Sequence, residues 1–252
     1  MTHQELLFQY VLRLADDALI MGHRLGEWCS KAPILEEDLA LTNMALDNIG
    51  RAEALLQYAA QIEGKGRTEN DLAYKRDERH FYNHLLCEQP NGNFADTMLR
   101  QFLLACFEYE LYSKLINSQD TQLAAIAAKT IKEVKYHKQH ARDWCLRLGD
   151  GTEESHALMQ SPLDQLWMYT AELFEKDELI DMLSTAGVAV DVSTLESAWT
   201  LEVLDTLNAA KLNRPQNGYM QTGSRLGIHS EHLGYILAEM QYLPRAYPNA
   251  QW

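Results

Sequence analysis

Four long segments of this chain carry apolar residues at every third or fourth position, and this periodicity constrains the fold more than any other feature. It predicts helices over residues 3–29, 35–62, 94–117 and 122–148. Only 13 Gly and 6 Pro punctuate the 252 residues, which leaves few turns for a many-stranded β fold. The sequence therefore predicts an all-α protein.

The connections between these segments indicate how the helices pair. A short loop at Pro33 joins the first two helices and another at residues 117–120 joins the next two, so each pair forms an antiparallel hairpin. Two long hairpins match a four-helix bundle with its core at about residues 3–149. Further helices are expected at about 154–174, 176–184, 192–212 and 229–243. We expect one domain over residues 1–252, with the additional helices at about 154–245.

Bundles of this type often hold two iron ions, bound by one carboxylate on each of two helices and a Glu-x-x-His pair on each of the other two. Here both pairs are degenerate. The second helix has Asn48 and Arg51 at these positions, and a guanidinium has no lone pair to donate to a metal. The fourth helix has Val134 three residues before His137, and an isopropyl group cannot ligate. We therefore expect no metal ligands and no catalytic residues in this chain.

The two remaining carboxylate positions are partly kept. Asp17 lies on the inner stripe of the first helix, and the Pro33 loop lies midway between it and Asn48, so both are expected at one height. Glu108 lies in the middle of the third helix, within about a turn of the level of Val134. Glu110 is the alternative to Glu108.

Two interpretations of these buried polar residues remain open. In the first, Asp17, Glu108 and His137 form a residual or altered metal site, which would fit an independent oxygenase or oxidase. In the second, which we favour, Arg51 replaces the charge of the metal and pairs with Asp17 and Glu108. An unpaired charge in a protein core is very costly, so a buried carboxylate needs such a partner.

Charge and composition exclude several classes of partner. The chain has 22 Lys and Arg against 36 Asp and Glu, a formal net charge of −14, which disfavours binding to nucleic acid or to an anionic membrane. No apolar stretch approaches the ~20 residues of a membrane span, and the first residues lack the pattern of a secretory signal. The four cysteines form no Cys-x-x-Cys pair. We expect a cytoplasmic protein with reduced thiols.

Several stretches resemble the non-catalytic ferritin-like subunit of the bacterial phenylacetyl-CoA 1,2-epoxidase (ring monooxygenase) family. The resemblance covers nearly the whole chain. The stretches are residues 16–33, which include GHRLGEWC at 22–29, then NMALD at 43–47, EQPNG at 88–92, residues 164–174, and GIHSEHLGYILAEMQ at 227–241.

This resemblance implies a ferritin-like structural subunit of aerobic phenylacetate catabolism that pairs with a ferritin-like di-iron catalytic subunit. It also implies other subunits, including a reductase that delivers electrons from NADPH, and it places no cofactor in this chain. His229, Glu231 and His232 belong to the most specific stretch. We interpret them as residues that cap a helix or contact another subunit. Trp144, Trp167 and Trp199 are expected in the core or an interface, since they lie in helical patterns.

Overall fold

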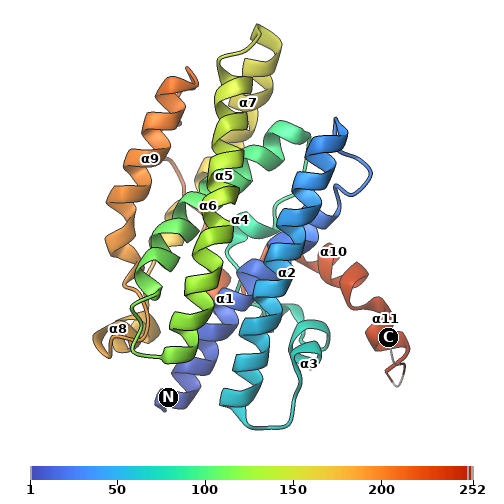
Figure 1. Ribbon diagram of the computed structural model, residues 1–252, viewed down its shortest axis with the longest axis vertical. Coiled ribbons are helices and arrows are strands. Elements are labelled where there is room, and N and C mark those ends of the chain that lie inside the picture. Colours follow the sequence, from blue (N-terminus) through green and yellow to red (C-terminus); the bar gives the residue numbers. More distant parts are fainter. Residues whose placement is uncertain (1, 249, 251–252) are drawn as a thin grey trace. The chain divides into compact units, whose positions relative to one another are not determined.

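The computed structural model describes residues 2–248 and 250 of the chain. The described residues form eleven α-helices and five short 3-10 helices and contain no strand, so the all-α prediction is confirmed (Figure 1). The α-helices are α1 His3–Gly26, α2 Leu35–Glu63, α3 Glu69–Tyr74, α4 Leu85–Glu88, α5 Phe94–Leu115, α6 Thr121–Gly149, α7 Glu153–Leu166, α8 Glu178–Thr185, α9 Glu196–Ala209, α10 Glu231–Met240 and α11 Tyr242–Ala246. The 3-10 helices are η1 Glu78–His80, η2 Trp167–Tyr169, η3 Ala171–Phe174, η4 Val192–Leu195 and η5 Ser224–Leu226.

The chain divides into two compact units, and each is built around one of the two predicted hairpins. The first unit consists of the described residues in Met1–Pro90 and Gly223–Trp252, with α1–α4, α10 and α11. The second unit, Asn91–Thr222, contains α5–α9. A single domain over residues 1–252 stays a prediction.

The first helix, α1, is buried on every side along most of its length. The capping box that the sequence predicts at its start is present. The N–H of Thr2 donates to Glu5 Oε2 at 2.7 Å, and Thr2 Oγ1 accepts from the N–H of Glu5 at 3.3 Å. Every residue at positions 10–22 is buried, including Asp16 and Asp17. Where the periodicity predicts one inner stripe, the structure therefore has an interior helix that carries two adjacent acids.

The α1–α2 hairpin is antiparallel, and its helices touch at Gly22. A Cβ added there would lie 2.8 Å from Ile49 Cδ1 and 3.3 Å from Asn48 Cβ. Asn48 is therefore beside Gly22, which lies five residues, or about 7.5 Å of helix, beyond Asp17. The predicted shared height of Asp17 and Asn48 is wrong.

The offset arises because α2 begins beyond the end of α1. The connection at residues 27–34 consists of turns and bends that run along this overhang instead of closing a tight loop (Figure 1). The first turns of α2 consequently leave apolar side chains in solvent: Leu35 is 71% exposed and Leu39 is 56% exposed.

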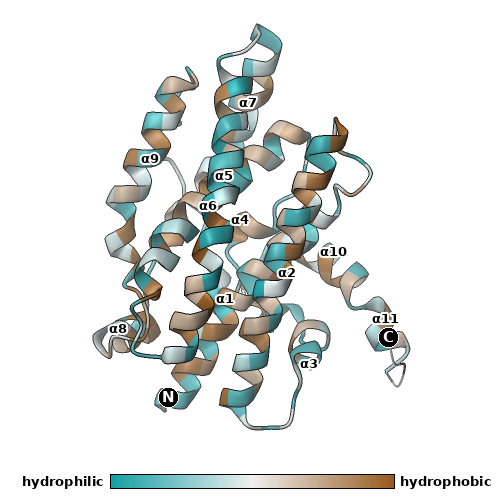
Figure 2. Ribbon diagram, in the orientation of Figure 1, coloured by the Kyte–Doolittle hydropathy of each residue, from teal (hydrophilic) through white to brown (hydrophobic). Residues whose placement is uncertain are grey.

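The second unit is organised around the α5–α6 hairpin. Asn93 caps α5 and accepts from the N–H of Ala95 at 2.7 Å. The rings of Phe94 and Trp144 meet edge to face with centroids 5.0 Å apart, which fixes the pairing of the two helices. Figure 2 shows hydrophobic and hydrophilic residues alternating along α6, as a helix with one buried face requires.

Aromatic side chains from the later helices pack against α5. The indole of Trp199 donates to the carbonyl of Leu103 at 2.9 Å, and its ring lies 5.3 Å from Phe174 and 5.9 Å from Trp167. Trp167 and Trp199 are both buried. The expectation that these two tryptophans belong to the core is confirmed. No helix in the described part of the chain is long and apolar enough to span a membrane.

The C-terminal segment joins the first unit through a turn that requires glycine. Gly227 has φ +73°, in the left-handed region, and its N–H donates to the carbonyl of Ser224 at 2.9 Å. A Cβ at this position would overlap the backbone carbonyl of Arg79. The turn therefore fixes the path of the chain into α10.

We predict that Gly227→Ala lowers the free energy of unfolding by at least about 2 kcal/mol, because it adds left-handed strain to a backbone overlap. The matched control is Gly50→Ala in α2, where an added Cβ meets nothing within 4 Å. This control should raise stability by about 0.5–1 kcal/mol through helix propensity. Urea denaturation followed by circular dichroism measures both, and equal effects of the two substitutions would contradict the prediction.

Candidate functional site

The two degenerate positions on α2 are occupied by residues that bond to each other. Asn48 Nδ2 donates to the carbonyl of Met44 at 2.8 Å, and Asn48 Oδ1 accepts from an Nη of Arg51 at 2.5 Å. Both side chains are buried. The amide thus spends both of its polar atoms on its own helix, and the residue three positions on brings a fixed positive charge.

The positions predicted on the second hairpin are also buried. Glu108 on α5 is 4% exposed, and Val134 and His137 on α6 are 0% and 1% exposed. The Phe94–Trp144 contact pairs the helices so that residue 130 lies opposite Glu108, one turn from Val134.

These residues do not fit a di-iron centre. Val134 has no donor atom, Arg51 has no lone pair, and the amide oxygen of Asn48 is already engaged. Across residues 2–248 and 250, no group of three or more His, Cys, Asp and Glu side chains is arranged to hold a metal ion. No step of metal chemistry is therefore assigned to these residues.

A different buried polar cluster lies in the first unit, and it begins with Asp16. Both carboxylate oxygens accept from the guanidinium of Arg76, one of them at 2.9 Å, and the N–H of Tyr82 donates to the same carboxylate at 2.9 Å. Asp16 is 0% exposed and Arg76 is 6% exposed. The guanidinium also lies over the ring of Phe81 at 4.1 Å. This bidentate pair joins α1 to the segment between α3 and α4.

Asp17, the next residue, takes its counter-charge from the far end of the chain. An Nη of Arg225 donates to Asp17 Oδ2 at 3.1 Å, the N–H of His84 donates to Oδ1 at 2.6 Å, and His84 Nδ1 lies 3.0 Å from Oδ2. Burial acts to raise the pKa of Asp17, but Arg225 and His84 outweigh it and hold that pKa well below its usual value.

The prediction that Arg51 neutralises Asp17 is therefore wrong. Arg225 supplies the positive charge, 208 residues along the chain. The physical cause is the offset of the hairpin, since Asn48 packs beside Gly22.

Glu88 forms the third part of the cluster. One carboxylate oxygen lies 2.8 Å from His229 Nδ1 and accepts from Asn83 Nδ2 at 2.9 Å, and the other accepts from the N–H of Ser230 at 2.6 Å. The backbone carbonyl of Glu88 accepts from an Nη of Arg24 at 2.6 Å. The side chains of Glu88 and His229 are both 0% exposed.

His229 is held as an imidazolium. Its Nδ1 faces the carboxylate of Glu88 and its Nε2 lies 2.8 Å from the carbonyl oxygen of Phe81, so each ring nitrogen meets an acceptor and must carry a proton. Burial acts to lower the pKa of His229, but the bond to Glu88 outweighs it and raises that pKa above its usual value.

His229 therefore has a role that the sequence does not reveal. It neither caps α10, whose N-cap is Ser230, nor lies on the surface of the chain. It ties the start of the last helices to α4. In the first turn of α10, Glu231 is exposed and His232 is half-buried. The one sequence signal for this cluster is the pair of adjacent acids in an otherwise apolar helix, since its partners lie 60 to 208 residues away.

The cysteines are not arranged for chemistry. Cys87, Cys106 and Cys145 are buried and Cys29 is exposed, and all four are free thiols. Burial raises the pKa of the Cys106 and Cys145 thiols, which keeps them protonated and unreactive.

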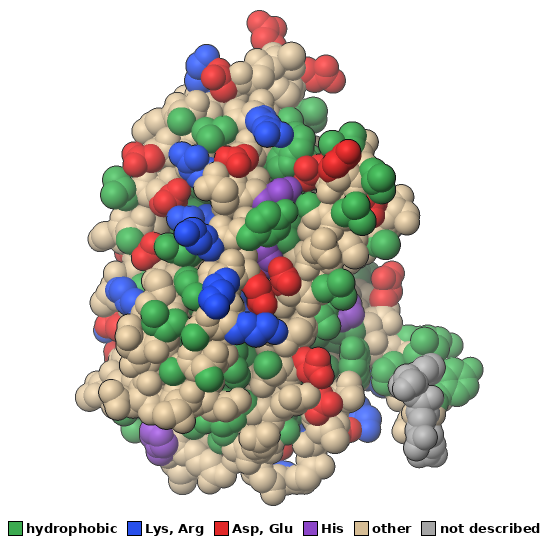
Figure 3. All heavy atoms as spheres, in the orientation of Figure 1, with side chains coloured by type: hydrophobic (Ala, Val, Ile, Leu, Met, Phe, Trp, Pro, Cys, Tyr) green, Lys and Arg blue, Asp and Glu red, His purple; other side chains and the backbone are tan. Residues whose placement is uncertain are grey.

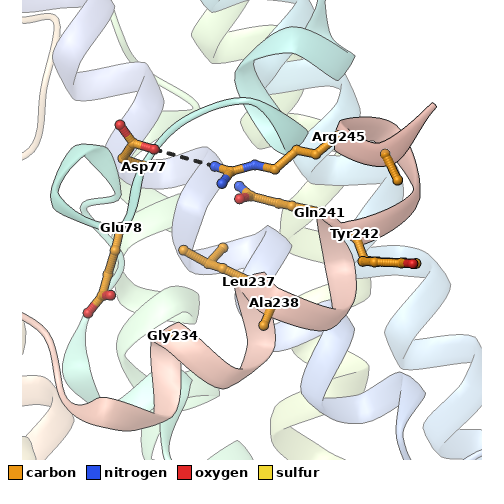
Figure 4. A pocket seen from close by; sticks show the side chains of 9 residues that line it. Asp77, Glu78, Gly234, Leu237, Ala238, Gln241, Tyr242 and Arg245 are labelled. Carbon is orange, nitrogen blue, oxygen red and sulfur yellow. Dashed lines mark hydrogen bonds and ion pairs between the residues drawn. The ribbon is translucent and has the colours of Figure 1, made fainter. Parts of the chain in front are cut away.

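A hollow of about 640 Å³ lies beside α10 and α11 (Figure 4). Gln241 and Arg245 point toward the segment before η1, where both donate to the carbonyl of Arg76, at 2.9 and 3.1 Å. Arg245 also pairs with Asp77 at 3.5 Å. Because these polar groups are already engaged, the residues that line the hollow do not form the converging set that a catalytic site needs.

The fold and the site define an all-helical protein in which buried ion pairs hold the first unit together and the ligand positions of a di-iron centre are replaced. All 252 residues match the family described as phenylacetic acid catabolic protein, and the chain belongs to this family. Over 246 residues it is 52% identical to one named subunit of the 1,2-phenylacetyl-CoA epoxidase of Escherichia coli (strain K12), covering 98% of this chain and 99% of that protein. The resemblance expected from the sequence is confirmed.

We predict that Asp17→Asn lowers the free energy of unfolding by about 3 kcal/mol, because it leaves the guanidinium of Arg225 without a carboxylate. Arg225→Gln should cost much less in the Asp17→Asn background than in the native chain. Urea denaturation of the four proteins gives this double-mutant cycle. The control Glu36→Gln, at an exposed position of α2, should change stability by less than about 0.5 kcal/mol. Additive effects of Asp17 and Arg225 would contradict the direct pairing.

The Glu88–His229 pair predicts a loss of stability at alkaline pH. The folded pKa of His229 lies above the unfolded value of about 6.5, so the stabilisation is fully present below pH 6.5 and is lost as pH rises through the folded pKa. The difference in unfolding free energy between the native chain and His229→Gln should therefore shrink between pH 6 and pH 9. His3→Gln, at an exposed position, should show no such trend.

A second measurement covers the case in which His229→Gln does not fold. Nitrogen-15 chemical shifts of the histidine rings in the native chain should show one residue that is doubly protonated at pH 7. A neutral ring for His229 at this pH would contradict the assignment.

Proposed function

We propose that this chain is the structural, accessory subunit of a multicomponent phenylacetyl-CoA epoxidase in aerobic phenylacetate catabolism. The observation that carries the proposal is the 52% identity to a phenylacetyl-CoA epoxidase subunit over nearly the full length of both proteins. A similarity that spans both chains from end to end supports the same place in the same kind of complex.

The chain has no activity of its own in this proposal, and its partner holds the di-iron centre. Asn48, Arg51 and Val134 stand where a catalytic ferritin-like chain needs Glu, His and Glu. In addition, the hydrogen bonds of Asp17 to His84 and Arg225 engage its carboxylate inside the first unit. The alternative of an independent oxygenase would have to break these pairs before iron could bind.

The proposed architecture is ferritin-like. The α1–α2 and α5–α6 hairpins would form one four-helix bundle, and the helices after α6 would pack around it. The apolar character of α1 and α5 on every side supports this arrangement, because a helix of this kind belongs inside a bundle.

The proposed partners follow from this place in the complex. The first is the ferritin-like di-iron catalytic subunit, with which this chain forms a heterodimer that it stabilises. The others are the remaining subunits, including the reductase that passes electrons from NADPH. We place the chain in the cytoplasm, and its net charge of −14 supports neither nucleic acid nor an anionic membrane as a partner.

We predict that the chain purified alone contains far less than one iron per molecule, and that co-expression with the catalytic subunit yields a stable complex with iron in the partner only. Size-exclusion chromatography, followed by separation of the chains and metal analysis of each, makes the measurement. Two irons per molecule of this chain would overturn the proposal.

A substitution at His137 separates the two functional interpretations. His137→Ala should leave the epoxidation rate of the assembled complex unchanged and should lower only its thermal stability. Abolished turnover in a complex that assembles normally would favour a catalytic role for this chain.

A further inference from the structure

The positive charge of this acidic protein is concentrated on α6. Within Thr121–Gly149 two acids oppose six fixed cations, although the whole chain has a net charge of −14. The cations are Lys129, Lys132, Lys135, Lys138, Arg142 and Arg147, and the acids are Glu133 and Asp143. Figure 3 shows Lys and Arg side chains gathered along the course of this helix.

The fold itself uses three of these cations. The ammonium group of Lys138 lies 3.1 Å from Glu202 on α9 and 4.3 Å from the centre of the Tyr109 ring. Arg142 lies 3.5 Å from the same Glu202, and Arg147 lies over the ring of Trp144 at 5.3 Å. These interactions stabilise the packing of α5, α6 and α9, so they need no external partner.

The other three, Lys129, Lys132 and Lys135, have no such use, and together we call them the lysine face. All three are exposed. Lys129 is 77% exposed and approaches Glu133 only to 3.8 Å, while Lys132 and Lys135 form no ion pair within the described part of the chain. Their spacing of three residues places like charges side by side on one helix, which costs about 0.2–0.5 kcal/mol per pair. Only the long approach of Lys129 to Glu133 offsets this repulsion.

The surroundings of the lysine face fit a protein partner better than a small anion. Tyr136 is 50% exposed beside it, and its ring lies 5.8 Å from that of His140. Ala125 and Ala128 on the preceding turn are also exposed and small, so another surface can approach closely. A convex helix face with one exposed tyrosine is typical of a protein contact, whereas small ligands occupy concave sites.

We propose that the lysine face of α6 is a docking surface for an acidic protein surface. Three exposed ammonium groups would steer carboxylates to this face by charge complementarity, and Tyr136 would supply the apolar contact at its edge. Nucleic acids and anionic membranes are poorer occupants, because the rest of the chain repels them. The identification of the partner as a component of the same complex rests on the proposed function.

The first experiment uses poly-L-glutamate as the acidic polypeptide and does not depend on the complex. The native chain should bind it at low salt and release it at about 0.3 M salt, because screening shortens the reach of surface charges. The triple variant Lys129→Glu, Lys132→Glu, Lys135→Glu should bind at least about tenfold more weakly. The matched control is Lys31→Glu, Lys65→Glu, Arg79→Glu, which makes the same change of net charge at exposed positions elsewhere and should lose much less.

The second experiment places the partner within the complex. A carbodiimide that joins lysine amines directly to carboxylates is applied to this chain co-purified with the catalytic subunit and mixed with the remaining components. Peptide mapping should show Lys129, Lys132 or Lys135 joined to Asp or Glu of one of those proteins. A variant with glutamine at the three positions should lose these cross-links while it still co-purifies with the catalytic subunit.

The outcomes separate the two proposals. Equal loss of poly-L-glutamate binding in the lysine-face and control variants would overturn the docking surface, as would stronger binding of coenzyme A or of anionic phospholipid vesicles to this face. Absence of the cross-links in an intact complex would overturn it as well. Failure of the chain to co-purify with the catalytic subunit would instead count against the proposed function, and the poly-L-glutamate experiment would still decide on the docking surface.

Discussion

The first unit of this protein depends on the neutralisation of three buried carboxylates. Asp16 and Asp17 lie side by side on an interior helix, and Glu88 ends the short helix α4. A buried unpaired carboxylate is prohibitively costly, so each needs a cation. Arg76, Arg225 and His229 supply the three charges. Because two of these lie beyond residue 222, the hairpin at the start of the chain requires the segment at its end.

The same constraint removes Asp17 from the set of possible metal ligands. A carboxylate ligand must present free oxygens to the ion, whereas Asp17 has given its oxygens to His84 and Arg225. On α2 the amide of Asn48 and the guanidinium of Arg51 bond to each other within one turn. These positions hold internal ties, which suits a subunit whose proposed task is to keep its shape beside a catalytic partner.

The surface shows how the chain divides its charges between folding and recognition. Glu202 on α9 engages Lys138 and Arg142, and Arg147 stacks on Trp144, so half of the cations on α6 serve the packing of the second unit. The lysine face remains exposed and mutually repulsive. The difference lies in whether a partner stands within reach, and this depends on how the helices pack.

The sequence by itself determined the helices and the replacement of the metal-ligand residues, since both depend on local pattern and residue chemistry. The 3.6-residue periodicity predicted α1, α2, α5 and α6 to within a few residues, and no packing can turn Val134 or Arg51 into a ligand. Only the tertiary structure decided which cation meets which acid. Arg51 stands 34 residues after Asp17 and was the natural partner on a symmetric hairpin, but α2 starts beyond the end of α1 and Asn48 packs beside Gly22. Ion pairs form through space, and a separation of 208 residues between Asp17 and Arg225 leaves no periodic trace in the sequence.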